Sequence, residues 1–149
     1  MKLVEFKNIV RPDNFERQSK NNKKQMIVND FDTEVILETE KDLLIFLNKR
    51  PAYNSNHFIL TFNENGFPQL SIFVKDNYCV IYFLEENGDA FVSCGESNKS
   101  DTEIFYENKF GSEIFLAEEN IISLLSMTES AKQFLNTKNR PSCIEWTNL

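Results

Sequence analysis

Apolar and polar residues alternate with a period of two between residues 57 and 117, which is typical of half-buried strands. Short runs rich in Asn, Gly and Asp interrupt the alternation, and tight turns favour these residues. The pattern therefore predicts an antiparallel meander. Its strands are expected at residues 57–62, 69–74, 78–84, 90–94, 103–106 and 113–116. The turns between them are expected at 63–66, 76–77 and 85–89, with a polar loop at 96–101.

Two segments show the wider spacing of amphipathic helices. The first follows Thr39, a good N-cap residue with acids in the next turn, and is expected over about 40–49 until Arg50-Pro51 ends it. The second is either one long helix over 118–136 or a shorter one.

Ser126 and Glu129 have the spacing of a capping box, which favours the shorter helix. We therefore expect an extended segment at 121–125 and a helix at 127–136. The helix face toward the sheet would consist of Ala131, Phe134 and Leu135.

The remaining segments complete the predicted fold. Residues 33–38 have the apolar content of a strand, and 142–146 are expected to form a final strand after Arg140-Pro141. The polar residues 11–25 are expected to form a loop. The whole pattern predicts one α+β domain over 1–149, with a mainly antiparallel sheet of about six to eight strands packed by two helices.

Composition fits an ordinary globular protein, with 41% hydrophobic and 26% charged residues, and the fourteen Phe are interpreted as core. The three cysteines, Cys79, Cys94 and Cys143, are too few and too scattered for a disulfide framework, and their apolar neighbours predict buried thiols. The sequence shows neither the apolar stretch of a signal peptide nor that of a membrane span. These features favour a protein of the reducing cytoplasm.

Charge is the most informative bulk property. The formal net charge is −7, and residues 85–119 alone hold ten acids against Lys99 and Lys109. Such a surface either keeps the protein soluble or attracts a basic partner electrostatically. Direct nucleic-acid binding is disfavoured, because phosphates require clustered Lys and Arg.

The sequence carries no recognisable catalytic apparatus. The only histidine, His57, starts a predicted strand, has no nucleophile motif beside it and is interpreted as structural or surface. There is no glycine-rich phosphate loop, no Cys-x-x-Cys pair and no calcium-loop pattern. We therefore expect no enzyme activity, no metal and no cofactor.

Several short motifs stand in an order that is more specific than any one of them. They are Gly66-Phe67-Pro68-x-Leu70, Val80-Ile81-Tyr82-Phe83, Phe91-Val92-Ser93-Cys94-Gly95, Ala131-x-x-Phe134-Leu135, and Arg140-Pro141 followed by Trp146. In this order they resemble the immunity protein 1 family of bacterial polymorphic toxin and contact-dependent growth inhibition systems. The resemblance covers about residues 57–147, with weaker agreement at 39–49. Asn139 departs from it, standing near where the family often has Gly, and 11–25 has no counterpart.

The resemblance implies an α+β fold and a role in binding a cognate toxin domain so that it cannot act. Toxins of related systems are often deaminases or nucleases, which must be basic where they meet phosphate. The acid-rich segment would then face such a partner and occlude its active site, with the protein itself expected to be a monomer. The candidate partner-binding residues are Glu85, Glu86, Asp89, Glu96, Asp101, Glu103, Tyr106 and Glu107, with Tyr106 as an aromatic anchor.

Two alternatives remain open at this point. One is a small-ligand-binding regulatory domain with a cavity between sheet and helix lined by Phe and Tyr. The other is an acidic protein-interaction module with a different basic partner. The motif residues Gly66, Gly95, Arg140, Pro141 and Trp146 are assigned to turns and packing and not to binding.

Overall fold

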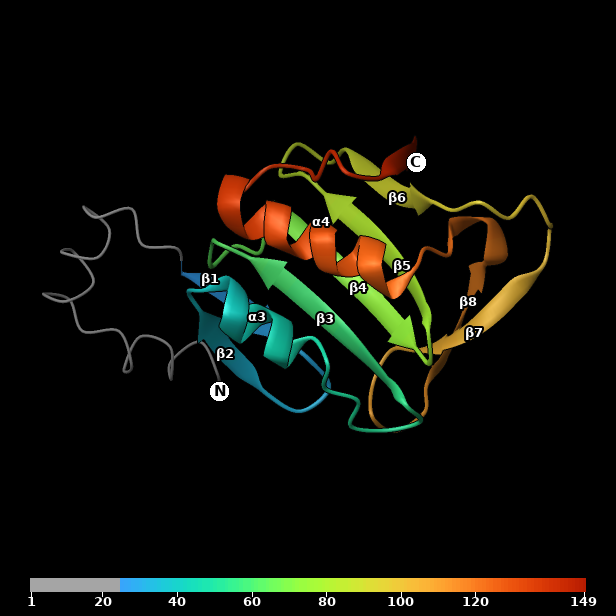
Figure 1. Cartoon of the computed structure of the whole chain (residues 1–149), viewed down its shortest axis with the longest axis horizontal. Helices are drawn as coiled ribbons and strands as arrows, with labels where there is room; N and C mark the ends of the chain where they lie inside the picture. Colours follow the sequence, from blue (N-terminus) through green and yellow to red (C-terminus); the bar gives the residue numbers. More distant parts are fainter. Residues whose placement is uncertain (1–24) are drawn as a thin grey trace, which may run out of the picture.

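The computed structural model describes residues 25–149, and its centre is a seven-stranded sheet that two α-helices cover on one face (Figure 1). All neighbouring strands of the sheet are antiparallel. Their spatial order is β2 (Glu34–Leu37), β1 (Met26–Asn29), β3 (Ser55–Thr61), β4 (Gln69–Lys75), β5 (Tyr78–Leu84), β6 (Ala90–Cys94) and β9 (Glu145–Asn148). The predicted α+β class with a mainly antiparallel sheet is confirmed.

Helices α3 (Glu40–Phe46) and α4 (Leu124–Thr137) pack on the same face of the sheet and enclose the larger core. The predicted face of α4 is confirmed, because Ala131, Phe134 and Leu135 are all buried. The Phe134 ring contacts those of Phe62 and Phe83, with ring centroids 5.3 and 5.9 Å apart. Burying aromatic rings of this size is a main source of the free energy of folding.

A separate hairpin packs against the opposite face of the sheet. It consists of β7 (Thr102–Tyr106) and β8 (Glu113–Ala117) and is followed by the short 3-10 helix η1 (Glu118–Asn120). The buried hairpin residues Phe105 and Leu116 join Phe73, Val80 and Val92 in a second, smaller core. Side chains alternate between the faces of a strand, so Phe73 points away from its neighbours Ile72 and Val74, which belong to the helix-covered core.

The start of α4 corrects the sequence prediction. The helix begins at Leu124 and not at 127, and its N-cap is Ser123, whose hydroxyl accepts a hydrogen bond from the backbone N–H of Ser126 at 3.1 Å. The predicted capping box is therefore wrong, and Glu129 pairs with Lys132 instead, at 3.2 Å. The extended segment ends at Ser123, because its last strand-like contact is the backbone bridge between Ile122 and Cys79.

Several boundaries differ from the expected ones. Helix α3 ends at Phe46 and not at 49, because the Arg50 guanidinium donates a hydrogen bond to the carbonyl of Leu47 and caps the C-terminal end of the helix there. The last strand is Glu145–Asn148 and not 142–146, since Trp146 lies beside Ser93 in the register with β6. Strand β1 was not predicted at all. The loop predicted at 11–25 lies outside the described residues except for Gln25.

The cysteine prediction is correct for one thiol and wrong for two. Cys79 is fully buried, and burial raises the pKa of its thiol to about 12, although the Arg50 guanidinium opposes that effect. Cys94 and Cys143 are exposed, because each lies where the chain leaves or approaches the β6–β9 edge of the sheet.

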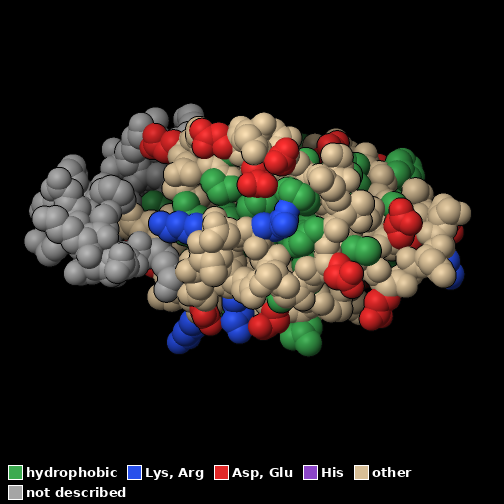
Figure 2. Space-filling model, turned by 90° about the horizontal axis from the view of Figure 1, so that it is seen from above, with side chains coloured by type: hydrophobic (Ala, Val, Ile, Leu, Met, Phe, Trp, Pro, Cys, Tyr) green, Lys and Arg blue, Asp and Glu red, His purple; other side chains and the backbone are tan. Residues whose placement is uncertain are grey.

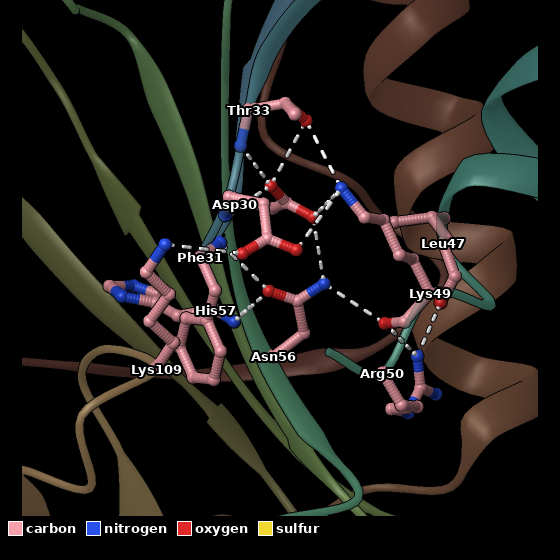
Figure 3. Close-up of polar contacts among 10 residues, drawn as sticks. Asp30, Phe31, Thr33, Leu47, Lys49, Arg50, Asn56, His57 and Lys109 are labelled. Atoms are coloured by element: carbon pink, nitrogen blue, oxygen red, sulfur yellow. Dashed lines mark hydrogen bonds and ion pairs between the residues drawn. The ribbon is translucent and has the colours of Figure 1, made fainter. Parts of the chain in front are cut away.

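A polar cluster around the buried side chain of Asp30, directly after β1, links this segment to the end of α3 (Figure 3). The side chain of Asp30 is fully buried and accepts hydrogen bonds from Asn56 at 3.0 Å and from the backbone of Thr33 at 2.8 Å. It also forms a 3.0 Å ion pair with Lys49, which follows α3. Asp32, two residues along, lies 3.7 Å from Lys109 at the tip of the hairpin.

Candidate functional site

A groove with a volume of about 740 Å³ opens where β5 begins, β6 ends and α4 starts. Strand β7 and the segment that leads into β9 complete its walls. The residues that line it are Tyr78, Cys94, Gly95, Glu96, Ser97, Glu103, Glu118, Ile121, Ile122, Ser123, Ser126, Ser142, Cys143, Ile144 and Glu145.

Four glutamates converge on this groove from four elements. Glu96 follows β6, Glu103 lies in β7, Glu118 opens η1, and Glu145 pairs with Cys94 across the β6–β9 register. Among the lining residues in the described part of the chain there is no Lys, Arg or His. Carboxylates grouped in a concavity focus a negative potential, which attracts a cationic partner.

Hydrogen bonds between β6 and the η1 segment fix one wall of the groove. The N–H of Gly95 donates to the carbonyl of Glu119 at 2.7 Å. The buried Ser93 hydroxyl donates to the carbonyl of Asn120 at 2.7 Å, and the Asn120 amide donates back to the carbonyl of Ser93 at 2.9 Å. Because these bonds are mostly shielded from water, the wall that carries Glu118 is held in one position.

The structure separates the predicted partner-binding residues into two groups. Five of them lie on or beside β7, at the groove end of the molecule: Glu96, Asp101, Glu103, Tyr106 and Glu107. The other three, Glu85, Glu86 and Asp89, form the β5–β6 turn. Strand β6 runs between the groups, and its five residues span about 17 Å.

Two groove acids, Glu118 and Glu145, were not among the predicted partner-binding residues. Glu145 lies 42 positions beyond Glu103 in the chain, so only the pairing of β9 with β6 brings it to the groove. On the face seen in Figure 2, acidic side chains lie along the upper edge and at the right-hand end, whereas most Lys and Arg lie at the left and in the middle. Strands β7 and β8 lie at the right in Figure 1, and the turn about the horizontal axis between the two views keeps them at the right-hand end.

Tyr106 and its neighbours attach the hairpin to the sheet. The Tyr106 ring stacks on Tyr53, with centroids 4.7 Å apart. His57 in β3 stacks on Phe73 at 3.9 Å, and its Nε2 is 2.8 Å from the Ser71 hydroxyl. Burial lowers the pKa of His57 to about 4, although a hydrogen bond with the backbone of Glu107 opposes that shift. The histidine is thus a neutral structural link between β3 and the hairpin.

The lowered pKa of His57 predicts a loss of stability in mild acid. The unfolded chain binds the proton with the ordinary pKa of 6.5, whereas the folded protein does so only near 4. Stability is therefore complete above about pH 6.5 and falls as the pH drops toward 4. We expect the free energy of unfolding to be about 2 kcal/mol lower at pH 5 than at pH 8. Urea denaturation at a series of pH values measures it.

The matched control is His57→Gln, which keeps a polar side chain but removes the titration. Its free energy of unfolding should change much less between pH 8 and pH 5. An equal loss in both proteins would assign the pH dependence to carboxylates and contradict the role given to His57.

No helix within residues 25–149 combines the length and the apolar character that crossing a membrane requires. The same residues contain no group of three or more His, Cys, Asp or Glu side chains arranged to hold a metal ion. The groove is also unlike a ligand cavity between sheet and helix, since Tyr78 is the only aromatic side chain among the described residues that line it.

Comparison with known proteins shows the family of the chain. No family model matches it. Over 124 residues, 83% of its length, the chain is 45% identical to the double-stranded DNA deaminase immunity protein of Burkholderia cenocepacia (strain H111), and the match covers all of that protein. The chain belongs to this immunity protein family. The immunity-protein resemblance seen in the sequence motifs is thereby confirmed.

Proposed function

We propose that this immunity protein binds a cognate double-stranded DNA deaminase toxin in the cytoplasm and occludes its active site with the acidic groove. It acts by binding and not by catalysis. The observation that carries the proposal is the groove itself, where four glutamates converge without a basic side chain among the lining residues. The relative is named as a double-stranded DNA deaminase immunity protein, which supports a deaminase toxin as the partner.

The chemistry of such a toxin explains why an acidic groove would neutralise it. An enzyme that works on duplex DNA needs Lys and Arg around its active site, because every base pair step carries phosphates. Carboxylates can occupy those cationic positions in place of phosphate. A protein that covers them would exclude the DNA without any contact to the reacting atoms.

Two triple substitutions test which acids bind the toxin. The groove variant changes Glu96, Glu103 and Glu145 to Lys, and the turn variant changes Glu85, Glu86 and Asp89 to Lys. Each raises the formal net charge from −7 to −1, so long-range attraction falls equally in both. We expect the groove variant to bind the toxin domain of the same bacterium about 100-fold more weakly, mainly through faster dissociation. The turn variant should lose less than about tenfold, mainly in association rate and only at low salt.

The readouts are binding kinetics and protection of a double-stranded oligonucleotide from deamination. Equal losses in both variants would assign binding to net charge and contradict the groove. A wild-type protein that neither binds nor inhibits the toxin would overturn the proposed function.

A second readout needs no substitution. The exposed thiols of Cys94 and Cys143 both line the groove, so bound toxin should protect them from alkylation.

A further inference from the structure

Apolar side chains gather on the outer face of the β7–β8 hairpin. Ile104 and Phe115 stand directly opposite each other in the register, and the Phe115 side chain is 60% exposed. Phe110 at the hairpin tip is 80% exposed. Single exposed apolar residues are ordinary, but neighbouring ones on one face mark an interaction site.

The exposure of Phe115 follows from the alternation of the strand. Ile114 and Leu116, its neighbours, point inward and pack against the smaller core with Phe105. Phe115 must then point outward, where most of its surface is exposed to solvent. The fold itself gains little from an aromatic ring in that position.

Acids surround this apolar face. Asp101, Glu107 and Glu113 lie on the hairpin strands or next to them, against the single base Lys109. Lys109 is already engaged, since its ammonium lies 3.7 Å from Asp32 and 5.6 Å from the centre of the Phe110 ring. An apolar centre with an acidic rim complements a basic protein and repels nucleic acid.

The hairpin borders the acidic groove with its inner side. Glu103 of β7 and Glu118, which follows β8 directly, both line the groove. A partner seated in the groove therefore also reaches the hairpin. The fifteen residues that line the groove are fewer than the roughly 20–30 that a stable protein interface uses on each partner, so a tight complex needs an adjoining surface.

We propose that the outer face of the β7–β8 hairpin is a second part of the toxin-binding surface, with Phe115 as its apolar anchor. The inference rests on the proposed function, because it takes the same toxin as the occupant. The groove acids contribute attraction and orientation, and Phe115 inserts into an apolar pocket of the toxin next to its cationic surface. Such buried anchors slow dissociation more than they speed association.

The test compares Phe115→Ala with Ile45→Ala, a matched loss of an exposed apolar side chain. Ile45 is 62% exposed and lies on α3, on the other face of the sheet. Against the purified toxin domain of the same bacterium, Phe115→Ala should raise koff about 30-fold or more and leave kon within about threefold. Ile45→Ala should change neither constant. Phe115→Thr, which retains strand propensity, should reproduce the effect at an unchanged Tm.

The outcomes separate this inference from the proposed function. Wild-type protein that binds the toxin while both Phe115 variants dissociate at the wild-type rate overturns the hairpin anchor and leaves the groove proposal intact. Wild-type protein that does not bind the toxin overturns both. A wild-type dimer in sedimentation that Phe115→Ala converts to monomer would instead make this face a contact between two copies and overturn the inference.

Discussion

Replacing Gly95 by alanine is expected to lower the free energy of unfolding by about 3 kcal/mol and to weaken toxin binding at the same time. A Cβ at this position would overlap the backbone carbonyl of Ile121 and lie 3.1 Å from the carbonyl oxygen of Glu119. Both neighbours are main-chain atoms, so no side-chain rotation relieves the contact. The segment from η1 to Ile122 must move away from β6, and Glu118 on the groove wall would move with it.

Urea denaturation measures the first effect and binding kinetics the second. Cys94→Ala is the control, because it alters the preceding residue, whose side chain is exposed, and should leave stability nearly unchanged. A Gly95→Ala protein with wild-type stability would show that the wall yields easily. The groove could then no longer be described as held in place by the β6–η1 contacts.

The sheet was predictable from the sequence where its contacts are local. Strands β4, β5 and β6 have the predicted residues almost without change, because β5 pairs with β4 and with β6 across short turns. Trp146 was assigned to packing, and its indole N–H donates to the carbonyl of Pro141 at 2.7 Å. Gly66 was assigned to a turn, and its φ of +88° is one that glycine adopts without strain.

What depends on distant residues could not be predicted. Strand β1 has only four residues, and it is stabilised by pairing with β3, some thirty positions later. Ser123 and Ser126 are equally good cap residues, so the start of α4 was decided by Ile122, which must be extended to bridge Cys79. A local capping signal cannot include that contact.

The candidate site was likewise predictable only where it depends on residues close in sequence. The acids of residues 85–107 are close in sequence, and their density alone suggested one surface. Strand β6 begins next to the acids of the β5–β6 turn and ends next to Glu96, so the length of the strand keeps the two groups apart. Conversely, β9 brings Glu145 into the groove from the end of the chain. The density of acids in a sequence therefore indicates the sign of the charge on a partner, whereas strand pairing determines which acids share one surface.

Replacing Asp30 by alanine is expected to lower the free energy of unfolding by about 4 kcal/mol. Its fully buried carboxylate accepts hydrogen bonds from the backbone of Asp32 at 2.9 Å and from Asn56 at 3.0 Å, and it pairs with Lys49 at 3.0 Å. Burial by itself would raise the pKa of Asp30, but these partners, with Thr33, outweigh it and keep the pKa below its ordinary value. The charged carboxylate is thus the stabilising form, and its removal deprives the buried Asn56 amide and the Lys49 ammonium of their partner.

Asp32→Ala is the matched control for Asp30→Ala, because it removes the same side chain two residues along. Asp32 is partly exposed, and its contacts to Lys49 and Lys109 are longer, at 3.8 and 3.7 Å, so we expect a loss below about 1 kcal/mol. Urea denaturation at pH 7 measures both variants. The Asp30 cluster links α3 to β1, whereas Asp32 reaches the hairpin through Lys109. Asp30→Ala should consequently weaken toxin binding only by lowering the fraction of folded protein. Equal destabilisation by the two variants would refute the special role of the buried carboxylate.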